Sequence, residues 1–361
     1  MPSPLPENSI TVNRRRLSGE VVGWSVSLRG GRVSQQVQES LQLRGSLFDG
    51  DQRTDVGSLA EVLDVLQTST AFGYLEIRDP DRLQLAELAD RLGADDIIHP
   101  PASASTGHMP MVAGEHVRLS THRVQLEEPT FQLVVADLHI YVLPRLLILD
   151  HDGDFDFEPL RARLATEKRH RDQGVGWLLW IVLDELLGEA GAALNALDDE
   201  LDDIEDVLLA PGAKPAIIQN RVYQLRKSAS RLRRCLLPLR DAVDALLRRE
   251  ADCVSPALFP LFQGLYDRGV HHVEWADSLR DLVTALSDTQ IAMEGNRLNV
   301  IMKKVTSWAA IIAVPAAVTG FYGQNLPYPG FNTMGGLWMS TLLMVVGCGG
   351  LYLTFKRKDW L

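Results

Sequence analysis

Apolar residues are distributed in two different ways along the chain. In the first half they form short runs separated by polar residues, and at the C-terminal end they form long uninterrupted runs. Short stretches with the composition of strands occur at 21–28, 72–77, 117–124, 131–140 and 146–149. A helix is predicted to begin with Asp79 as its N-cap and Pro80 in its first turn, and to end near Gly93. We therefore predict a mixed α/β domain over residues 1–165.

A pair of helices with opposite charges is predicted within residues 166–254. Residues 177–209 are crowded with acidic side chains and residues 221–250 with arginine, and the loop 210–215 contains proline and glycine. Opposite charge favours antiparallel packing of adjacent helices through exposed ion pairs, each of small individual worth. An alternative is that the acidic helix attracts cations.

One long helix is predicted over residues 255–304, because the pattern is helical and no proline occurs in this range after Pro260. At 1.5 Å per residue it would form a rod of roughly 70 Å. Four carboxylates recur along it at intervals of seven and therefore share one stripe: Asp267, Glu274, Asp281 and Asp288. The stripe is either an ordinary solvated face or a device that concentrates divalent cations at a pore mouth.

The C-terminal end contains a block of 51 residues, 305–355, without any Asp, Glu, Lys, Arg or His. We predict a transmembrane helix over 305–325, an external loop over 326–334 and a second transmembrane helix over 335–355. Each run has about 20 residues, which matches a hydrocarbon core roughly 30 Å thick. Buried core helices are the alternative, but they rarely run this long without a polar face.

Basic residues flank both predicted spans. Lys303 and Lys304 precede the first, and Lys356, Arg357 and Lys358 form a basic tail at the membrane interface after the second. Because positive charge marks the cytoplasmic side, both termini are expected in the cytoplasm and the uncharged loop outside. The expected location is the plasma or inner membrane, with the lipid bilayer as a partner.

The first span is rich in small side chains, which let helices approach one another closely. Two spans of one chain cannot enclose a water-filled path, so this span is expected to meet copies of itself. The seven-residue interval of the carboxylate stripe can be extended into this span. Adding the positions three residues before or four residues after each member gives a seam like the a and d positions of a coiled coil. The predicted pore-lining residues are Asp288, Asn299, Met302, Thr306, Ala309, Ala313, Ala316 and Gly320.

Composition excludes several classes of function. Lys and Arg number 36 against 47 Asp and Glu, and the net charge of −11 argues against nucleic acid as a partner. Cys235, Cys253 and Cys348 are far apart, which indicates neither a disulfide framework nor a zinc site. Since no phosphate-binding glycine loop, nucleophile elbow or Cys/His dyad occurs, the chain is not expected to be an enzyme.

Several C-terminal motifs carry a resemblance to a known family. They are residues 298–306 (Leu-Asn-Val-Ile-Met-Lys-Lys-Val-Thr), Pro315, residues 320–325 (Gly-Phe-Tyr-Gly-Gln-Asn) and residues 356–361 (Lys-Arg-Lys-Asp-Trp-Leu). Together they resemble the CorA family of divalent-cation transporters, whose hallmark is Gly-Met-Asn at the end of the first span. Weaker similarity occurs at 95–98, 224–227, 232–240 and 266–267.

The resemblance implies a homopentamer with a cytoplasmic funnel, in which the long helix lines the funnel and continues as the pore. It implies a selectivity filter at Tyr322, Gly323, Gln324 and Asn325. Mg²⁺ sheds water reluctantly, so the Asn325 side-chain oxygen and the Gly323 carbonyl suit its hydration shell better than a tight cage would. Mg²⁺ would then be the substrate and a candidate regulator that closes the pore from between cytoplasmic subunits, and no permanent cofactor is expected.

The chain departs from the family pattern at three places. Gln324 replaces the usual Met, the external loop has no acidic residue, and Gly264 occupies a position where some members have a regulatory aspartate. The remaining candidates for a regulatory metal site are Asp95, Asp96, Asp267 and Asp288.

We therefore predict an α+β membrane protein that conducts divalent cations, Mg²⁺ first and Co²⁺ or Ni²⁺ as further candidates, driven by the membrane potential. A zinc transporter of the same family is one alternative, because family members differ in the ion they carry. The other is a membrane-anchored scaffold or sensor whose spans only hold copies together.

Overall fold

The computed structural model describes residues 12–13, 25–26, 43–98, 111–113, 115–152, 156–210, 215–248, 253–324 and 333–361. The chain divides into two compact units. The first consists of Met1–Leu197 and Ser228–Asp277, and the second of Asp198–Lys227 and Ser278–Leu361. Asn325, the last residue of the predicted first transmembrane helix, and residues 326–332 of the predicted external loop lie outside the described residues.

The first unit is built around a seven-stranded sheet with the order β4-β3-β5-β9-β8-β7-β6. Only β5 and β9 pair in parallel; the other neighbours are antiparallel. The strands are β3 (Leu43–Asp49), β4 (Gln52–Val56), β5 (Phe72–Arg78), β6 (Met111–Ala113), β7 (His116–Glu127), β8 (Gln132–Val142) and β9 (Leu146–His151). Two short strands, β1 (Val12–Asn13) and β2 (Ser25–Val26), pair separately. Every residue of β9 is buried, as expected for a central strand covered on both faces.

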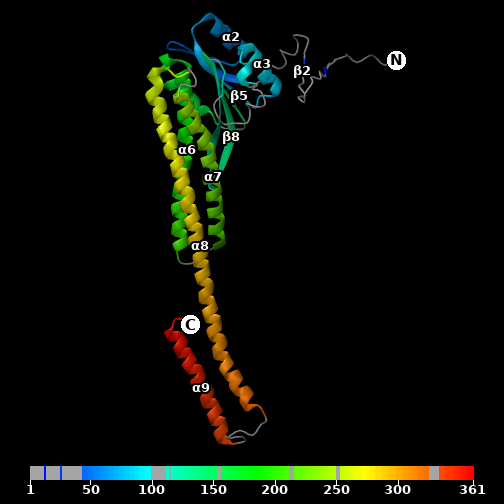
Figure 1. The fold of residues 1–361 in the computed structure, drawn as a ribbon, viewed down its shortest axis with the longest axis vertical. Helices are drawn as coiled ribbons and strands as arrows, with labels where there is room; N and C mark the ends of the chain where they lie inside the picture. Colours follow the sequence, from blue (N-terminus) through cyan, green and yellow to red (C-terminus); the bar gives the residue numbers. More distant parts are fainter. Residues whose placement is uncertain are drawn as a thin grey trace, which may run out of the picture. The chain divides into compact units, whose positions relative to one another are not determined.

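Helices cover both faces of this sheet, giving three layers (Figure 1). On one face the apolar core includes residues from α2 (Leu59–Thr68), α3 (Arg82–Leu92) and α4 (Asp95–Ile98). On the other face, the fully buried ring of Trp177 meets Phe48 edge to face, with ring centroids 5.7 Å apart. Arg123 of β7 crosses to the helical layer, where its Nε lies 2.8 Å from Glu189 Oε1.

The structure confirms the predicted strands at 72–77, 117–124, 131–140 and 146–149, and of 21–28 it describes only Ser25–Val26. The predicted N-cap of α3 was wrong by two residues. Asp81 is the cap: its carboxylate accepts from Gln84 N at 2.8 Å, and the Gln84 side chain accepts from Asp81 N at 2.8 Å. The predicted end is confirmed, since Gly93 caps the helix with φ 65°.

The α-helices that the structure describes after the sheet are α5 (Glu158–Thr166), α6 (Val175–Leu209), α7 (Pro215–Leu247), α8 (Phe259–Tyr322) and α9 (Met334–Arg357). The predicted charged pair corresponds to α6 and α7, and the predicted long helix to α8, which has 64 residues and continues into the first apolar run. Among the described residues, two helices are long and apolar enough to cross a membrane: α8 with its preceding turn, and α9.

Asp150 is a buried carboxylate near the end of β9, only 5% exposed. Burial, reinforced by the charge of Asp152, raises the pKa of Asp150 from 3.8 to about 6, although Tyr141 Oη donates a hydrogen bond to it at 3.4 Å. The folded protein therefore binds this proton more tightly than the unfolded chain does. The contribution of Asp150 to stability is lost as the pH rises from the unfolded pKa to the folded one, and it stays lost above about pH 6.

Replacing Asp150 by Asn should stabilise the first unit at neutral pH, because Asn keeps an acceptor for Tyr141 and removes the buried charge. A pKa raised by about two units corresponds to roughly 3 kcal/mol of unfolding free energy at pH 7.5, and the gain should vanish near pH 4. Thermal unfolding at the two pH values measures it, with the exposed Asp51→Asn as control. An equal gain at both pH values would contradict this account.

Candidate functional site: the membrane hairpin

The end of α8 and α9 form a helical hairpin in the second unit (Figure 1). The two helices contact each other closely near Gly347, where an added Cβ would lie 2.8 Å from Val314 Cγ1. One turn earlier on α8, the Ile311 carbonyl accepts a hydrogen bond from the Cys348 thiol of α9 at 3.5 Å. Small residues at this contact let the backbones approach, as is typical of membrane helices.

Polar groups inside the hairpin are satisfied locally. Ser307 is fully buried, and its hydroxyl donates to the Lys303 carbonyl at 2.7 Å. Thr333 caps the start of α9 by accepting from Gly336 N at 3.3 Å. A hydrocarbon environment offers no alternative partners, so such internal hydrogen bonds allow these residues in the spans.

The predicted pore-lining seam lies on the opposite side of α8. The face toward α9 contains the buried Ser307 and Val318 and the partly buried Val314, whereas every predicted seam residue is exposed. At about 100° per residue, the seam is centred roughly 130° around the helix from the α9 contact. Its exposed members are Asp288, Asn299, Met302, Thr306, Ala309, Ala313, Ala316 and Gly320.

The predicted filter begins where α8 ends. Tyr322 is the last helical residue, and Gly323 N still donates to the Thr319 carbonyl at 2.8 Å. A Cβ on Gly323 would lie 2.9 Å from that same carbonyl oxygen, so a side chain here would crowd the last turn. Gln324 is exposed and its N donates to the Phe321 carbonyl at 3.3 Å.

The predicted regulatory aspartates are all exposed and are not gathered into one site within a single chain. Asp95 and Asp96 lie in α4, and Asp96 Oδ1 is 3.4 Å from His116 Nδ1, a neighbour that the sequence did not indicate. Asp267 Oδ1 accepts from Gln263 Nε2 at 3.0 Å. Over the residues the structure describes, no three His, Cys, Asp or Glu side chains converge on a metal position.

Acidic side chains also line a small cavity in the second unit, with a volume of about 190 Å³. Asp198, Asp202 and Glu205 of α6 surround it, and its apolar wall includes Leu282 and Leu286 of α8. Their spacing on one helix face was not recognised in the sequence, although the acidic character of the helix was.

The basic tail follows α9 with aromatic rings beside it. Lys356 Nζ lies 5.8 Å from the Tyr352 ring centroid. The rings of Trp360 and Phe355 stack with their centroids 5.7 Å apart. Lys356, Arg357 and Lys358 are exposed. Cationic and aromatic side chains together at a helix end are typical of a membrane interface.

Comparison with known proteins gives a family match over most of the chain. The model of a family described as "CorA-like Mg2+ transporter protein" matches residues 69–357. The cobalt/magnesium transport protein CorA of Methanocaldococcus jannaschii is 28% identical over 239 residues, which is 64% of this chain and 75% of that protein. The zinc transport protein ZntB of Pectobacterium carotovorum is 25% identical over 186 residues, 51% of this chain and 56% of that protein.

The fold is also that of a solved structure. The complete structure of the CorA magnesium transporter from M. jannaschii matches with a TM-score of 0.70 and covers 88% of this chain and 98% of its own. The sequence identity in that superposition is 22%. The α/β domain and the long helix leading into two C-terminal apolar helices are therefore confirmed.

Replacing Gly347 by Leu should separate α8 from α9, because the new side chain would overlap Val314. We expect the melting temperature of the detergent-solubilised protein to fall by several degrees, as overpacking typically costs about 1–3 kcal/mol. Gly349→Leu is the matched control, since nothing lies within 4 Å of its added Cβ. Equal melting temperatures for the two variants would contradict the packing described.

Proposed function

Because this chain belongs to the CorA-like Mg²⁺ transporter family, it is a divalent metal cation transporter and not an enzyme, and we propose that its copies surround a pore for Mg²⁺. One observation carries the proposal most directly. The α8 face opposite α9 is exposed along the whole predicted seam, and it combines small and polar residues. A face of this composition suits a water-containing axis better than it suits lipid.

The stretch of α8 before the membrane supports assembly from several chains. From Ile291 to Thr306 every residue is exposed, including Leu298 and Met302, each 63% exposed. Apolar surface of this extent around one helix needs a cover, and copies of the same helix would supply it. Five copies is the number that the family resemblance implies.

The filter would consist of Tyr322, Gly323, Gln324 and Asn325 from each copy. Neutral carbonyl and amide oxygens can contact the water shell of Mg²⁺ without stripping it. Gly323 places no side chain against the Thr319 carbonyl, and Gln324 adds a further amide where the Gly-Met-Asn hallmark has Met. Gln324 therefore keeps the ring neutral.

The membrane potential would drive the ion inward. With the basic tail of Lys356, Arg357 and Lys358 on the cytoplasmic side, both termini lie in the cytoplasm and the filter faces outward. Each elementary charge gains about 2.3 kcal/mol per 100 mV, and a divalent ion gains twice as much. No other energy source is required.

Regulation would use carboxylates from neighbouring copies. Asp95, Asp96, Asp267 and Asp288 are exposed, and no group of three acidic, His or Cys side chains converges within the described chain, so we expect a regulatory cation to bridge two copies. Filling such sites at high cytoplasmic Mg²⁺ would hold the copies together and close the pore. Gly264, with open space around it, contributes no ligand.

Zinc is the second candidate ion. The similarity to the zinc transport protein ZntB and the altered middle residue of the filter, Gln324, both favour it. A competition between Zn²⁺ and Mg²⁺ in the same flux measurement distinguishes the two ions.

Asn325→Ala should abolish or deregulate Mg²⁺ flux, because it removes an oxygen ligand from every copy at once. In proteoliposomes with an imposed inside-negative potential and an internal Mg²⁺ dye, we expect uptake to change by at least about tenfold. Asn220→Ala, exposed on α7, is the matched control and should transport normally. Absence of any flux in the unaltered protein would favour the scaffold or sensor, and Zn²⁺ uptake exceeding Mg²⁺ uptake would favour the zinc transporter.

Ala313→Cys should place a thiol on the pore axis, whereas Ile312→Cys, one residue away, should place it toward lipid. In a background without the native cysteines, we expect a cationic thiol reagent to inhibit Mg²⁺ flux through Ala313→Cys about tenfold and leave Ile312→Cys nearly unaffected. The reverse result would mean that the seam does not face the axis.

A further inference from the structure

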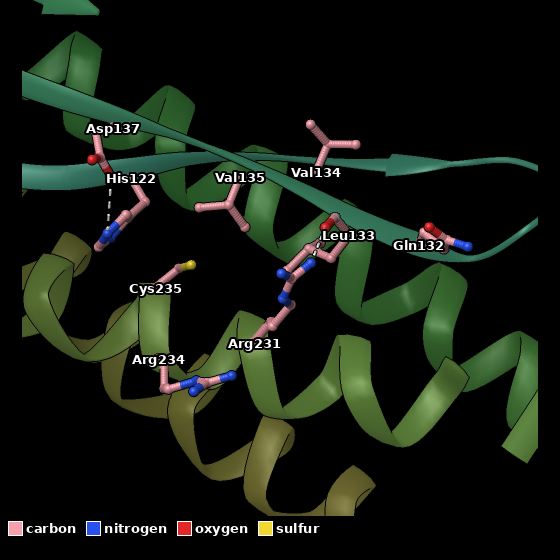
Figure 2. A pocket seen from close by; sticks show the side chains of 9 residues that line it. All are labelled: His122, Gln132, Leu133, Val134, Val135, Asp137, Arg231, Arg234 and Cys235. Carbon is pink, nitrogen blue, oxygen red and sulfur yellow. Dashed lines mark hydrogen bonds and ion pairs between the residues drawn. The ribbon is translucent and has the colours of Figure 1, made fainter. Parts of the chain in front are cut away.

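A cleft of about 620 Å³ lies in the first unit between the β7–β8 hairpin and α7 (Figure 2). Its volume is within the range of small-molecule sites. Figure 2 shows His122 and Val135 directed from the strands toward α7, and Arg231 and Cys235 directed from α7 toward the strands. The complete lining consists of His122, Gln132, Leu133, Val134, Val135, Asp137, Arg231, Arg234 and Cys235.

Two arginines give the cleft a cationic wall. Arg231 Nη1 donates to the Leu133 carbonyl at 3.4 Å, and Arg234 Nε donates to the Ser230 carbonyl at 3.3 Å. Both side chains are exposed, and neither has a carboxylate partner within the described part of the chain. Most of their guanidinium N–H groups therefore remain available to a ligand.

Other arginines of α7 are already used by ion pairs. Arg221 forms two hydrogen bonds with Glu200, at 2.7 and 2.9 Å, and Arg233 Nε lies 2.6 Å from Asp277 Oδ1. Arg240 pairs with Asp241 of the same helix, and Arg248, just after the helix ends, pairs with Asp244. The two guanidinium groups at the cleft thus differ from these neighbours in forming no ion pair within the described part of the chain.

The remaining lining is apolar in the middle and polar at the ends. Val135 and Cys235 form the middle, where burial raises the pKa of the Cys235 thiol to about 11 and keeps the sulfur neutral. At one end His122 Nε2 lies 3.4 Å from Asp137 Oδ1, and at the other end is the exposed amide of Gln132. A single carboxylate, Asp137, opposes the two arginines.

We propose that this cleft binds a small organic phosphate, whose phosphate lies on Arg231 and Arg234 and whose uncharged body lies against Val135 and Cys235. Planar guanidinium groups match phosphate oxygens in paired hydrogen bonds, and the several oxygens of one phosphate can serve two arginines at once. A metal cation would be repelled by the same pair. A purely apolar ligand would desolvate the guanidinium groups without replacing their hydrogen bonds.

Binding of AMP to the full-length protein in detergent tests the proposal by isothermal titration calorimetry. AMP carries a phosphate and a flat uncharged body, while adenosine and inorganic phosphate each supply one part. We expect saturable AMP binding at one site per chain, at least about tenfold tighter than that of adenosine or phosphate alone. AMP should also raise the melting temperature, because it binds only the folded state.

Substitutions locate the ligand. Arg231→Gln and Arg234→Gln should each weaken AMP binding about tenfold or more, since each removes charge-assisted hydrogen bonds. Arg234→Lys keeps the charge but not the planar fork and should lose less than Arg234→Gln. Arg226→Gln is the matched control: it is exposed on the same helix, does not line the cleft and should leave the affinity unchanged.

Three results would overturn the proposal. They are no saturable binding of AMP up to about 10 mM, equal affinity of adenosine and AMP, or equal losses in Arg226→Gln and Arg231→Gln. A second copy covering the two arginines in the assembly would produce the first of these. Because the measurement is equilibrium binding, its failure leaves the proposed transport function standing.

Discussion

The hairpin depends on one constraint: the membrane segment of α8 must present two different faces from a single run of uncharged residues. Hydrocarbon cannot solvate a backbone amide or a hydroxyl, so the segment stays helical and Ser307 bonds to its own chain. One face of this segment contacts α9 closely, at Gly347 and Cys348 of α9. The opposite face is left with alanine and glycine, and this division of α8 is what makes a shared axis feasible.

The hairpin and the long helix could be predicted because both follow from patterns that involve neighbouring residues only. A block of 51 uncharged residues has few alternatives to two spans, and α8 shows continuous helical periodicity. That Ala313 and Ala316 share one face of α8 could be predicted by counting, since a helix fixes angular position from residue number alone.

The first unit was predicted less completely, and the reasons are local. Strands β3 and β4 were not recognised, because Gly45 and Ser46 interrupt the apolar run of β3, although the turn at Gly50 has the positive φ that marks a hairpin. The cap of α3 was misplaced because Asp79 and Asp81 both flank Pro80. Only the two reciprocal hydrogen bonds between Asp81 and Gln84 identify Asp81 as the N-cap.

The cleft at Arg231 and Arg234 could not be predicted, because it depends on how α7 is placed against β8. Ser228 fixes that placement: its hydroxyl donates to the Phe131 carbonyl at 2.7 Å and accepts from Leu133 N at 3.2 Å. One helical turn further along, Arg231 is then brought to the Leu133 carbonyl. The arginine-rich pattern of the helix indicated ion pairs. Over the described residues Arg231 and Arg234 form none, and this makes their part of the helix face a candidate anion site.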